Sequence, residues 1–193
     1  MTRATPIGRT SRTRNSEVSD RQAPLRRVYE QKPAEAMIVD HGRTLGRDLA
    51  DPLRTSAAPG EEYAVETVEI AVGTHRGVGG HHDAPNPGEL LCATLAACQD
   101  STIRMVADLL GVQLTSLAVQ VEGDVDLRGC LAVDRSVRVG FQSMRSRTQL
   151  GVPPGTDSRT VELLLAAAER SCVVLDTLRH GVDVEAGVEI VKR

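Results

Sequence analysis

The stretch Gly79–Cys98, G-G-H-H-D-A-P-N-P-G-E-L-L-C-A-T-L-A-A-C, marks a glycine-rich loop that runs into a long helix. Asn86 can cap this helix, and Pro87 suits its first position, where the backbone N–H has no partner in any case. Glu89 follows the cap by three residues, which is the spacing of a capping box. We therefore expect a helix over residues 87–110, about 36 Å long at about 1.5 Å per residue.

The first half of this helix is apolar on nearly every side. Residues 90–98 read L-L-C-A-T-L-A-A-C, and Thr94 is their one hydroxyl side chain. A helix of this kind is expected to be buried all round rather than laid on a surface. Aromatic residues make up only 2% of the chain, so one chain has few large side chains to bury. A core shared between two chains, in an obligate dimer, is therefore expected.

A second helix is expected over residues 158–180. A Pro-Pro-Gly break at 153–155 precedes it, a polar residue among 156–158 can cap it, and Gly181 suits its end. Helical spacing stacks four small or apolar side chains on one face of this helix, namely Leu164, Ala168, Cys172 and Leu175.

The remaining pattern is that of strands and loops. Short apolar or alternating segments predict strands at 37–39, 63–72, 114–125, 136–144 and 182–191. Segments rich in glycine and proline predict loops at 45–60 and 73–83. The resulting order of strands, long helix, two strands, long helix and strand is that of an α+β fold.

The chain divides into an N-terminal arm and one domain. Residues 1–35 are polar, contain many arginines and show no hydrophobic period, which is typical of a flexible arm or of a segment ordered only against a partner. Residues 36–193 hold all the predicted strands and both helices, and a chain of this length can form one domain with a sizeable core.

Composition argues against several classes of partner. A net charge of −3 and the near absence of aromatic residues do not favour nucleic-acid binding by a basic surface or by base stacking. No apolar stretch reaches the roughly 20 residues that span a bilayer, so no membrane partner is expected. The first residues lack the apolar segment of a secretory signal, and four cysteines then favour free or redox-active thiols in a cytoplasmic protein.

Two cysteines are the candidates for chemistry. Cys98 is expected about three turns into the first helix, and Cys172 about four turns into the second. A cysteine inside an apolar helix can also serve as a small hydrophobic side chain, and that alternative stays open. Because neither thiol is expected near a helix N-terminus, a reactive thiolate would need a cation from elsewhere, most plainly an arginine.

The other cysteines and the histidines favour simpler interpretations. Cys92 cannot share a helix face with Cys98, which follows it by six residues, so Cys92 is expected to pack in the core. Cys130 is expected to be incidental in a turn. His75, His81 and His82 share one loop, where they either anchor it or join a metal site. No helical spacing aligns them as ligands, and there is no Cys-x-x-Cys motif, so neither a metal nor an organic cofactor is expected.

The two helices together resemble those of the OsmC/Ohr superfamily. In that superfamily a glycine-rich loop leads into P-x-x-L-L-x-A-x-x-A-A-C, to which residues 87–98 are similar. Residues 167–178, A-A-E-R-S-C-V-V-L-D-T-L, look like its second cysteine helix, and residues 121–129, V-E-G-D-V-D-L-R-G, look like one of its strands. The resemblance covers about residues 36–191. It implies an intertwined homodimer in which sheets from both chains wrap around long central helices.

The resemblance also implies a chemistry. The first cysteine, here Cys98, would attack a peroxide and become a sulfenic acid, and the second, here Cys172, would form a disulfide with it that a dithiol of lipoyl or thioredoxin type later reduces. In the family an arginine on the N-terminal strand segment and a glutamate at the start of the first helix hold the thiolate. Arg43 and Glu89 are the matching residues, and Arg76 is a weaker match for the arginine.

The chain departs from the peroxidase pattern at the acid. The glutamate of the peroxidases stands ten residues before the reactive cysteine, where this chain has Gly88, and Glu89 is displaced by one residue, which is about 100° around a helix. Val173 also replaces a proline that often follows the second cysteine. These features resemble the broader OsmC-like branch more than a typical organic hydroperoxide reductase.

Two functions follow from these observations. The first is a peroxiredoxin-like thiol peroxidase that reduces organic hydroperoxides or hydrogen peroxide in oxidative stress defence. The alternative is a non-enzymatic homodimer that binds a small molecule and lacks the catalytic acid. The position of Glu89, and whether Arg43 reaches Cys98, distinguish the two.

Overall fold

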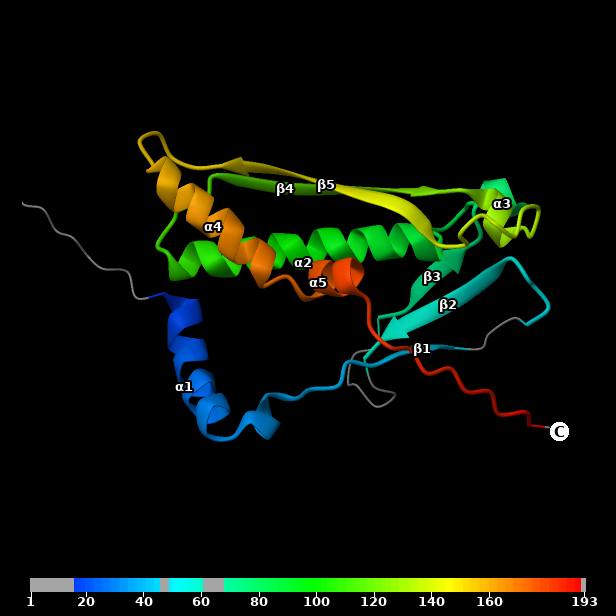
Figure 1. The fold of residues 1–193 in the computed structure, drawn as a ribbon, viewed down its shortest axis with the longest axis horizontal. Coiled ribbons are helices and arrows are strands. Elements are labelled where there is room, and N and C mark those ends of the chain that lie inside the picture. The colour runs from blue at the N-terminus through cyan, green and yellow to red at the C-terminus, as the bar shows by residue number, and fades with distance from the viewer. Residues whose placement is uncertain (1–15, 46–48, 61–67, 192–193) are drawn as a thin grey trace, which may run out of the picture.

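The computed structural model describes residues 16–45, 49–60 and 68–191. Helix α2, Pro87–Leu109, runs through the length of the molecule, and a long hairpin of two strands, β4 and β5, lies along one side of it (Figure 1). Helices α4 and α5 lie beside α2, and a small sheet of β1, β2 and β3 lies near its N-terminal end. The α+β class expected from the sequence is confirmed.

Helix α2 begins and ends as its sequence predicts. The Asn86 side chain accepts hydrogen bonds from the backbone N–H groups of Gly88 and Glu89, at 2.9 and 3.2 Å, and the Glu89 carboxylate closes the capping box. Gly111, beyond the other end, has a φ of +67°, a conformation that favours glycine.

The expectation that α2 is buried all round is wrong for the single chain. One face is buried, with Leu95, Thr102, Ile103 and Val106 among its side chains. The face that carries Ala97 and Ser101 is exposed, because no other described element of the chain covers it.

The hairpin has a long antiparallel register. Strand β4, Ser116–Val125, pairs with β5, Phe141–Gly151, and a register shift at 124–125 marks a bulge near the hairpin's connection. The predicted strand 114–125 is confirmed, whereas the second strand begins at residue 141 rather than 136 and continues to residue 151. The connection between the strands contains a short helix, α3, Leu127–Cys130, where the sequence suggested only a turn.

The small sheet corrects two expectations. Its strands, β1 (Gly42–Thr44), β2 (Arg54–Pro59) and β3 (Ile70–Gly73), pair antiparallel in that order. Strand β2 lies within the predicted loop 45–60, since backbone pairing with both neighbours overrides a sequence, R-T-S-A-A-P, that has no strong strand pattern. Residues 37–39 form no strand. Of the predicted strand 63–72, residues 63–67 lie outside the described part of the chain.

The second long helix is in fact two helices. Helix α4, Ser158–Arg170, begins at Asp157, whose carboxylate accepts a hydrogen bond from the Thr160 N–H at 2.9 Å. Helix α5, Val173–His180, follows after a break at Cys172, where the backbone is extended with φ −85° and ψ 102°. No glycine or proline marks this break, so residue type did not reveal it.

The core lies where the C-terminal half of α2 meets α4 and the hairpin. Its buried side chains include Ile103 and Ala107 of α2 and Leu164 and Ala168 of α4, and partly buried residues of β4 and β5 pack against them. The core therefore consists of medium-sized aliphatic side chains packed between the helices and the hairpin. This composition is expected for a chain with so few aromatic residues.

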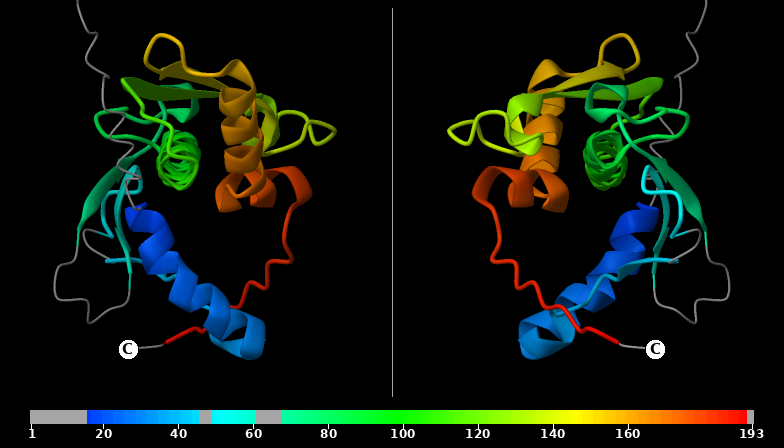
Figure 2. Two further views of the ribbon diagram at one scale, coloured as in Figure 1. Left: turned by 90° about the vertical axis from the view of Figure 1, so that its left-hand side faces the viewer. Right: turned by 90° about the vertical axis from the view of Figure 1, so that its right-hand side faces the viewer.

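Both ends of the described chain extend away from the hairpin. Helix α1, Glu17–Gln31, and a 3-10 turn, Pro33–Ala36, leave α2 on the side opposite to β4 and β5, as does the C-terminal segment (Figure 2). The Ser16 hydroxyl donates to the Asp108 carboxylate at 2.6 Å, and the Val18 N–H donates to the same oxygen at 2.9 Å. The sequence predicted no helix in this region, because α1 has no buried side chain and hence no hydrophobic stripe.

The C-terminal segment is not the predicted strand. Residues 182–191 are extended but unpaired, and their apolar side chains are exposed, with Val188 at 92%. The alternating pattern is real, but the described part of the chain provides no strand edge for it. Among the described residues, no helix is both long and apolar enough to cross a membrane.

Candidate functional site

Cys98 lies in the middle of α2 and is half-buried. Its backbone carbonyl accepts hydrogen bonds from the side chains of Ser101 and Thr102, at 3.0 and 2.7 Å. Both hydrogen bonds involve the backbone of Cys98 and not its thiol.

Cys172 is almost completely buried, at 1% exposure, and stands at the N-cap of α5. The two candidate thiols are neighbours in space: Cys98 lies close enough to Cys172 to raise the pKa of the Cys172 thiol, although the two residues are far apart in the sequence. Both thiols are free rather than joined in a disulfide, and their joint role in a reaction stays a prediction.

The electrostatics of Cys172 combine opposing effects. Burial raises the pKa of its thiol, and the neighbouring Cys98 thiol acts in the same direction. Backbone N–H groups of Leu175 and Val174, at the start of α5, lower this pKa but do not overcome burial. The expectation that Cys172 lies far from a helix N-terminus is therefore wrong, because α4 and α5 are separate helices. The thiol nevertheless stays protonated at neutral pH.

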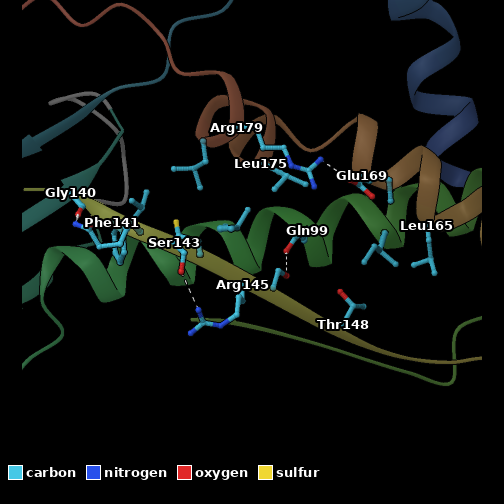
Figure 3. Close-up of a pocket in the computed structure, with 18 of the residues that line it drawn as sticks. Gln99, Gly140, Phe141, Ser143, Arg145, Thr148, Leu165, Glu169, Leu175 and Arg179 are labelled. Carbon is cyan, nitrogen blue, oxygen red and sulfur yellow. Dashed lines mark hydrogen bonds and ion pairs between the residues drawn. The ribbon is translucent and has the colours of Figure 1, made fainter. Parts of the chain in front are cut away.

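A cavity of about 710 Å³ lies between α2, α4, α5 and β5, and the residues that line it are neighbours of Cys98 and Cys172 but do not include either cysteine. Figure 3 shows side chains that line it. Leu95 and Gln99, the neighbours of Cys98 on α2, line it, together with Ala168 and Leu175, which lie on either side of Cys172 in the sequence. Further apolar walls come from both cysteine helices and the hairpin, through Leu91, Ile103, Phe141, Met144, Leu165 and Leu178. The cavity can thus admit a small apolar molecule beside the thiols.

The cavity also contains charged side chains that sequence reasoning missed. Arg179 of α5 donates to the Glu169 carboxylate of α4 at 2.7 Å, across the mouth of the cavity (Figure 3). Arg179 follows Cys172 by about two helical turns, so both lie on one side of α5. The sequence shows the spacing of seven residues, but only the structure shows that α5 begins at Cys172 and that the spacing therefore places both residues on one side of α5.

Arg43 lies on β1, in the sheet at the N-terminal end of α2. Its guanidinium donates to the carbonyl oxygen of Gly60 at 2.9 Å, and its backbone pairs with Ala58 of β2. The described residues that line the cavity beside the thiols do not include Arg43. Its predicted contact with Cys98 therefore stays a prediction.

Glu89 takes part in the helix cap rather than in the thiol pair. Its carboxylate accepts from the Asn86 N–H at 2.8 Å and meets His82 Nε2 at 3.0 Å. These two hydrogen bonds, the backbone one first, hold the pKa of the Glu89 carboxyl below its usual range. Glu89 precedes Cys98 by two and a half helical turns, so the two side chains leave α2 on opposite sides.

Gly88, at the position of the family's glutamate, lies close to the ring of Phe141 on β5. A Cβ atom added to Gly88 would lie 3.3 Å from the ring of Phe141 and 3.1 Å from Oδ1 of Asn86. The hairpin therefore approaches α2 closely at the point where the peroxidases of the superfamily carry their glutamate.

The remaining cysteines and histidines do not form a metal centre. The rings of His75 and His82 lie 4.7 Å apart, and His75 Nδ1 accepts a hydrogen bond from the Gly77 N–H at 2.9 Å. The Cys130 thiol donates to the Leu127 carbonyl within α3 at 3.3 Å. Residues 16–45, 49–60 and 68–191 contain no group of three side chains that could hold a metal ion.

Comparison with known proteins agrees with this geometry. Residues 80–187, more than half of the chain, match the family model of the OsmC-like proteins. No curated protein matches the sequence.

Solved structures share the fold. An organic hydroperoxide resistance protein OsmC from Legionella pneumophila is 21% identical over 77% of this chain and 95% of its own, with a TM-score of 0.54. An OsmC-like protein from Mycoplasma pneumoniae is 12% identical, over 74% and 89% of the two chains, with a TM-score of 0.55. An organic hydroperoxide resistance protein from Elizabethkingia anophelis is 18% identical, over 75% and 90%, with a TM-score of 0.52. Both the match over residues 80–187 and the shared fold lead to one conclusion: the chain belongs to the OsmC-like family.

Proposed function

We propose that this protein is a thiol-dependent peroxidase that acts on organic hydroperoxides or hydrogen peroxide. The observation that carries the proposal is the proximity of Cys98, in the middle of α2, to Cys172, at the start of α5, which is close enough for Cys98 to raise the pKa of the Cys172 thiol. The names of two structural neighbours, both organic hydroperoxide resistance proteins, agree with a role in peroxide defence.

The burial of the two thiols suggests which of them attacks. Cys98 is half-buried beside the cavity, whereas Cys172 is almost inaccessible and its pKa is raised by burial. The less buried thiol is the one that a peroxide can reach. Cys98 is therefore the attacking residue in this proposal, and Cys172 the resolving one.

The proposed cycle needs no metal and no organic cofactor. The Cys98 thiolate attacks one peroxide oxygen, the O–O bond breaks, and the leaving alkoxide takes a proton and departs as an alcohol, or as water when the substrate is hydrogen peroxide. Cys98 is now a sulfenic acid. The Cys172 thiol displaces its hydroxyl as water and forms a disulfide, and a dithiol of lipoyl or thioredoxin type reduces that disulfide while it is itself oxidised.

The chain offers two candidate cations for the thiolate. Arg43 is the family's matching arginine, and Arg179 is the one, of the three arginines that line the first cavity, that lies on the helix beginning at Cys172. Glu89 leaves α2 on the side opposite to Cys98, and Gly88 offers no carboxylate, so the family's glutamate has no equivalent beside this thiol among the described residues of α2. We therefore expect Cys98 to be less activated than in a peroxidase that has the arginine–glutamate pair.

The alternative function has its own support. A dimer that binds a small molecule without turning it over would keep the cavity of about 710 Å³ and would not need a carboxylate near Cys98. The displaced Glu89, engaged in the helix cap, is the observation that favours this alternative.

A homodimer in the cytoplasm is proposed with either function. The uncovered face of α2 and the exposed valines of residues 182–191 are surfaces that a second copy of the chain would bury. Free cysteines throughout the described residues suit a reducing compartment. Light scattering at micromolar concentration should give twice 20.7 kDa, and a stable folded monomer would contradict the dimer.

Peroxide consumption tests the enzymatic proposal. The wild-type protein, with dihydrolipoamide or thioredoxin as reductant, is expected to consume cumene hydroperoxide catalytically, and Cys98→Ser to lose this activity. Cys130→Ser is the matched control, because Cys130 is exposed on α3 and has no contact with the thiol pair in the described structure. If Cys98→Ser retains wild-type turnover, the proposed mechanism is wrong.

A further inference from the structure

A second cavity of about 1140 Å³ lies on another side of α2. Its wall on α2 is formed by Glu89, Cys92 and Ala96, which helical spacing places on the side of α2 away from Cys98. Strand β3, the loop that precedes α2, helix α3 and the adjoining ends of β4 and β5 complete the enclosure. The cavity shares Phe141 and Gly140 with the first cavity, and the residues that line either cavity do not include Cys98 or Cys172.

The lining of this second cavity is mostly apolar. Aliphatic and aromatic side chains from five different elements face it, among them Val72, Ala96, Val121, Leu127 and Phe141. A cavity of this size lined in this way is large enough for a small organic molecule.

The charged side chains in the lining all have polar partners. Arg54 forms an ion pair with Asp83, the Glu89 carboxylate is hydrogen-bonded to the Asn86 N–H and His82, and Glu122 lies 3.6 Å from the Arg145 guanidinium, which also pairs with Asp124. Burial, with the nearby Glu89 charge as a second cause, raises the pKa of the Cys92 thiol, so this group is neutral at pH 7. Each charged group of the lining is thus already engaged, and the rest of the lining is mostly apolar.

We propose that this second cavity binds a neutral, predominantly apolar small molecule, at a site separate from the thiol pair. The argument rests on the match between an apolar wall, a set of charges that already have partners, and a volume suited to such a ligand. Its occupant contacts Cys92, which explains the place of this cysteine better than core packing alone, since Cys92 is only half-buried and lines open space.

The test uses a matched pair of fluorescent probes on the full-length protein. N-phenyl-1-naphthylamine is neutral, and 1-anilinonaphthalene-8-sulfonate has the same rings with one negative charge. The neutral probe is expected to bind saturably at one site per chain, at least tenfold more tightly than the sulfonate. Equal affinity for both probes, or binding that does not saturate, would overturn the proposal.

Filling the cavity locates the site. Ala96→Phe places a large side chain in it, and we expect at least a tenfold loss of affinity for the neutral probe. Leu165→Phe is the matched control, because it adds bulk only beside the thiol cavity. Circular dichroism checks that both variants fold. Should Ala96→Phe fail to fold, reversible attachment of a benzylthio group to Cys92, in a chain whose other cysteines are serine, fills the same space.

Two outcomes of these experiments contradict the proposal. If neither modification weakens binding, the probe binds elsewhere. If the wild-type dimer does not bind the probe at all, a segment of the second copy occupies the cavity. The peroxidase proposal is tested separately through Cys98, which this binding assay does not use, so either proposal can fail while the other stands.

Discussion

Oxidation of the thiol pair is expected to stabilise the fold strongly, and the size of the effect follows from the chain length that the bond encloses. A disulfide between Cys98 and Cys172 would close a long loop that holds the whole hairpin, α3 and α4. For a loop of this length, the loss of chain entropy in the unfolded state corresponds to about 4 kcal/mol of added stability, before any strain in the native state is subtracted. The proximity of the two thiols in the fold is what makes this bond the expected product of oxidation.

The measurement is urea unfolding of the oxidised and the reduced protein. Cys92→Ala and Cys130→Ser remove the other thiols from both samples, and circular dichroism reports unfolding because the chain has no tryptophan. With an m-value of about 2 kcal/mol per molar urea, about 4 kcal/mol moves the midpoint by about 2 M. Both samples are compared at one protein concentration, because the stability of a dimer depends on it.

The outcome separates a working thiol pair from two cysteines that merely pack together. Mild peroxide should produce the cross-link, with a midpoint that returns to the reduced value on addition of dithiothreitol, and Cys172→Ser should show neither change. Sulfinic acid on Cys98 with Cys172 unmodified would mean that no resolving step exists. A cross-linked protein no more stable than the reduced one would refute the loop-closure reasoning.

Three further predictions concern the fold. Leu164→Ala, at a side chain with 0% exposure, should lower the free energy of unfolding by about 2 to 5 kcal/mol in urea denaturation, and a loss below about 1 kcal/mol would mean that this core collapses freely. Asp108→Ala should release α1, so hydrogen exchange should speed up in residues 17–31 while the core stays protected; unchanged protection would show that the capping contacts from Ser16 and Val18 do not hold this helix. The Arg145 guanidinium lowers the pKa of Asp124, so this carboxylate stabilises the folded state above its unfolded pKa of about 3.9 and loses that effect as pH falls through the lower folded value. Asp124→Asn should therefore be less stable than wild type at pH 7 and should approach it below pH 4, and a constant difference across that range would contradict the assignment.

Local patterns in the sequence were sufficient for the elements whose stability is local. The capping box at Asn86 and the glycine at 111 define α2 because caps and helical hydrogen bonds involve only near neighbours. Strand β4 was equally clear from its alternation, since one face of it packs on α2. The family resemblance, carried by the two cysteine segments, was likewise readable and is confirmed by the family match.

Other elements depend on what the chain meets in space. Strand β2 exists because two neighbouring strands offer it hydrogen bonds, and the alternating segment 182–191 is no strand because no described edge does so. Helix α1 has no buried face, and its start is held by contacts with Asp108, which is distant in the sequence. None of these partners can be inferred from residue type at the segment itself.

The candidate site was likewise predicted in part by the sequence and in part only by the structure. The sequence alone identified Cys98 and Cys172, and it showed that the glutamate had moved by one residue. Only the tertiary structure showed that Cys98 lies near Cys172, that Cys172 begins a separate helix, and that Arg179 lines the neighbouring cavity. The physical reason is that helical spacing determines which way a side chain leaves its own helix, whereas packing between helices determines what that side chain meets.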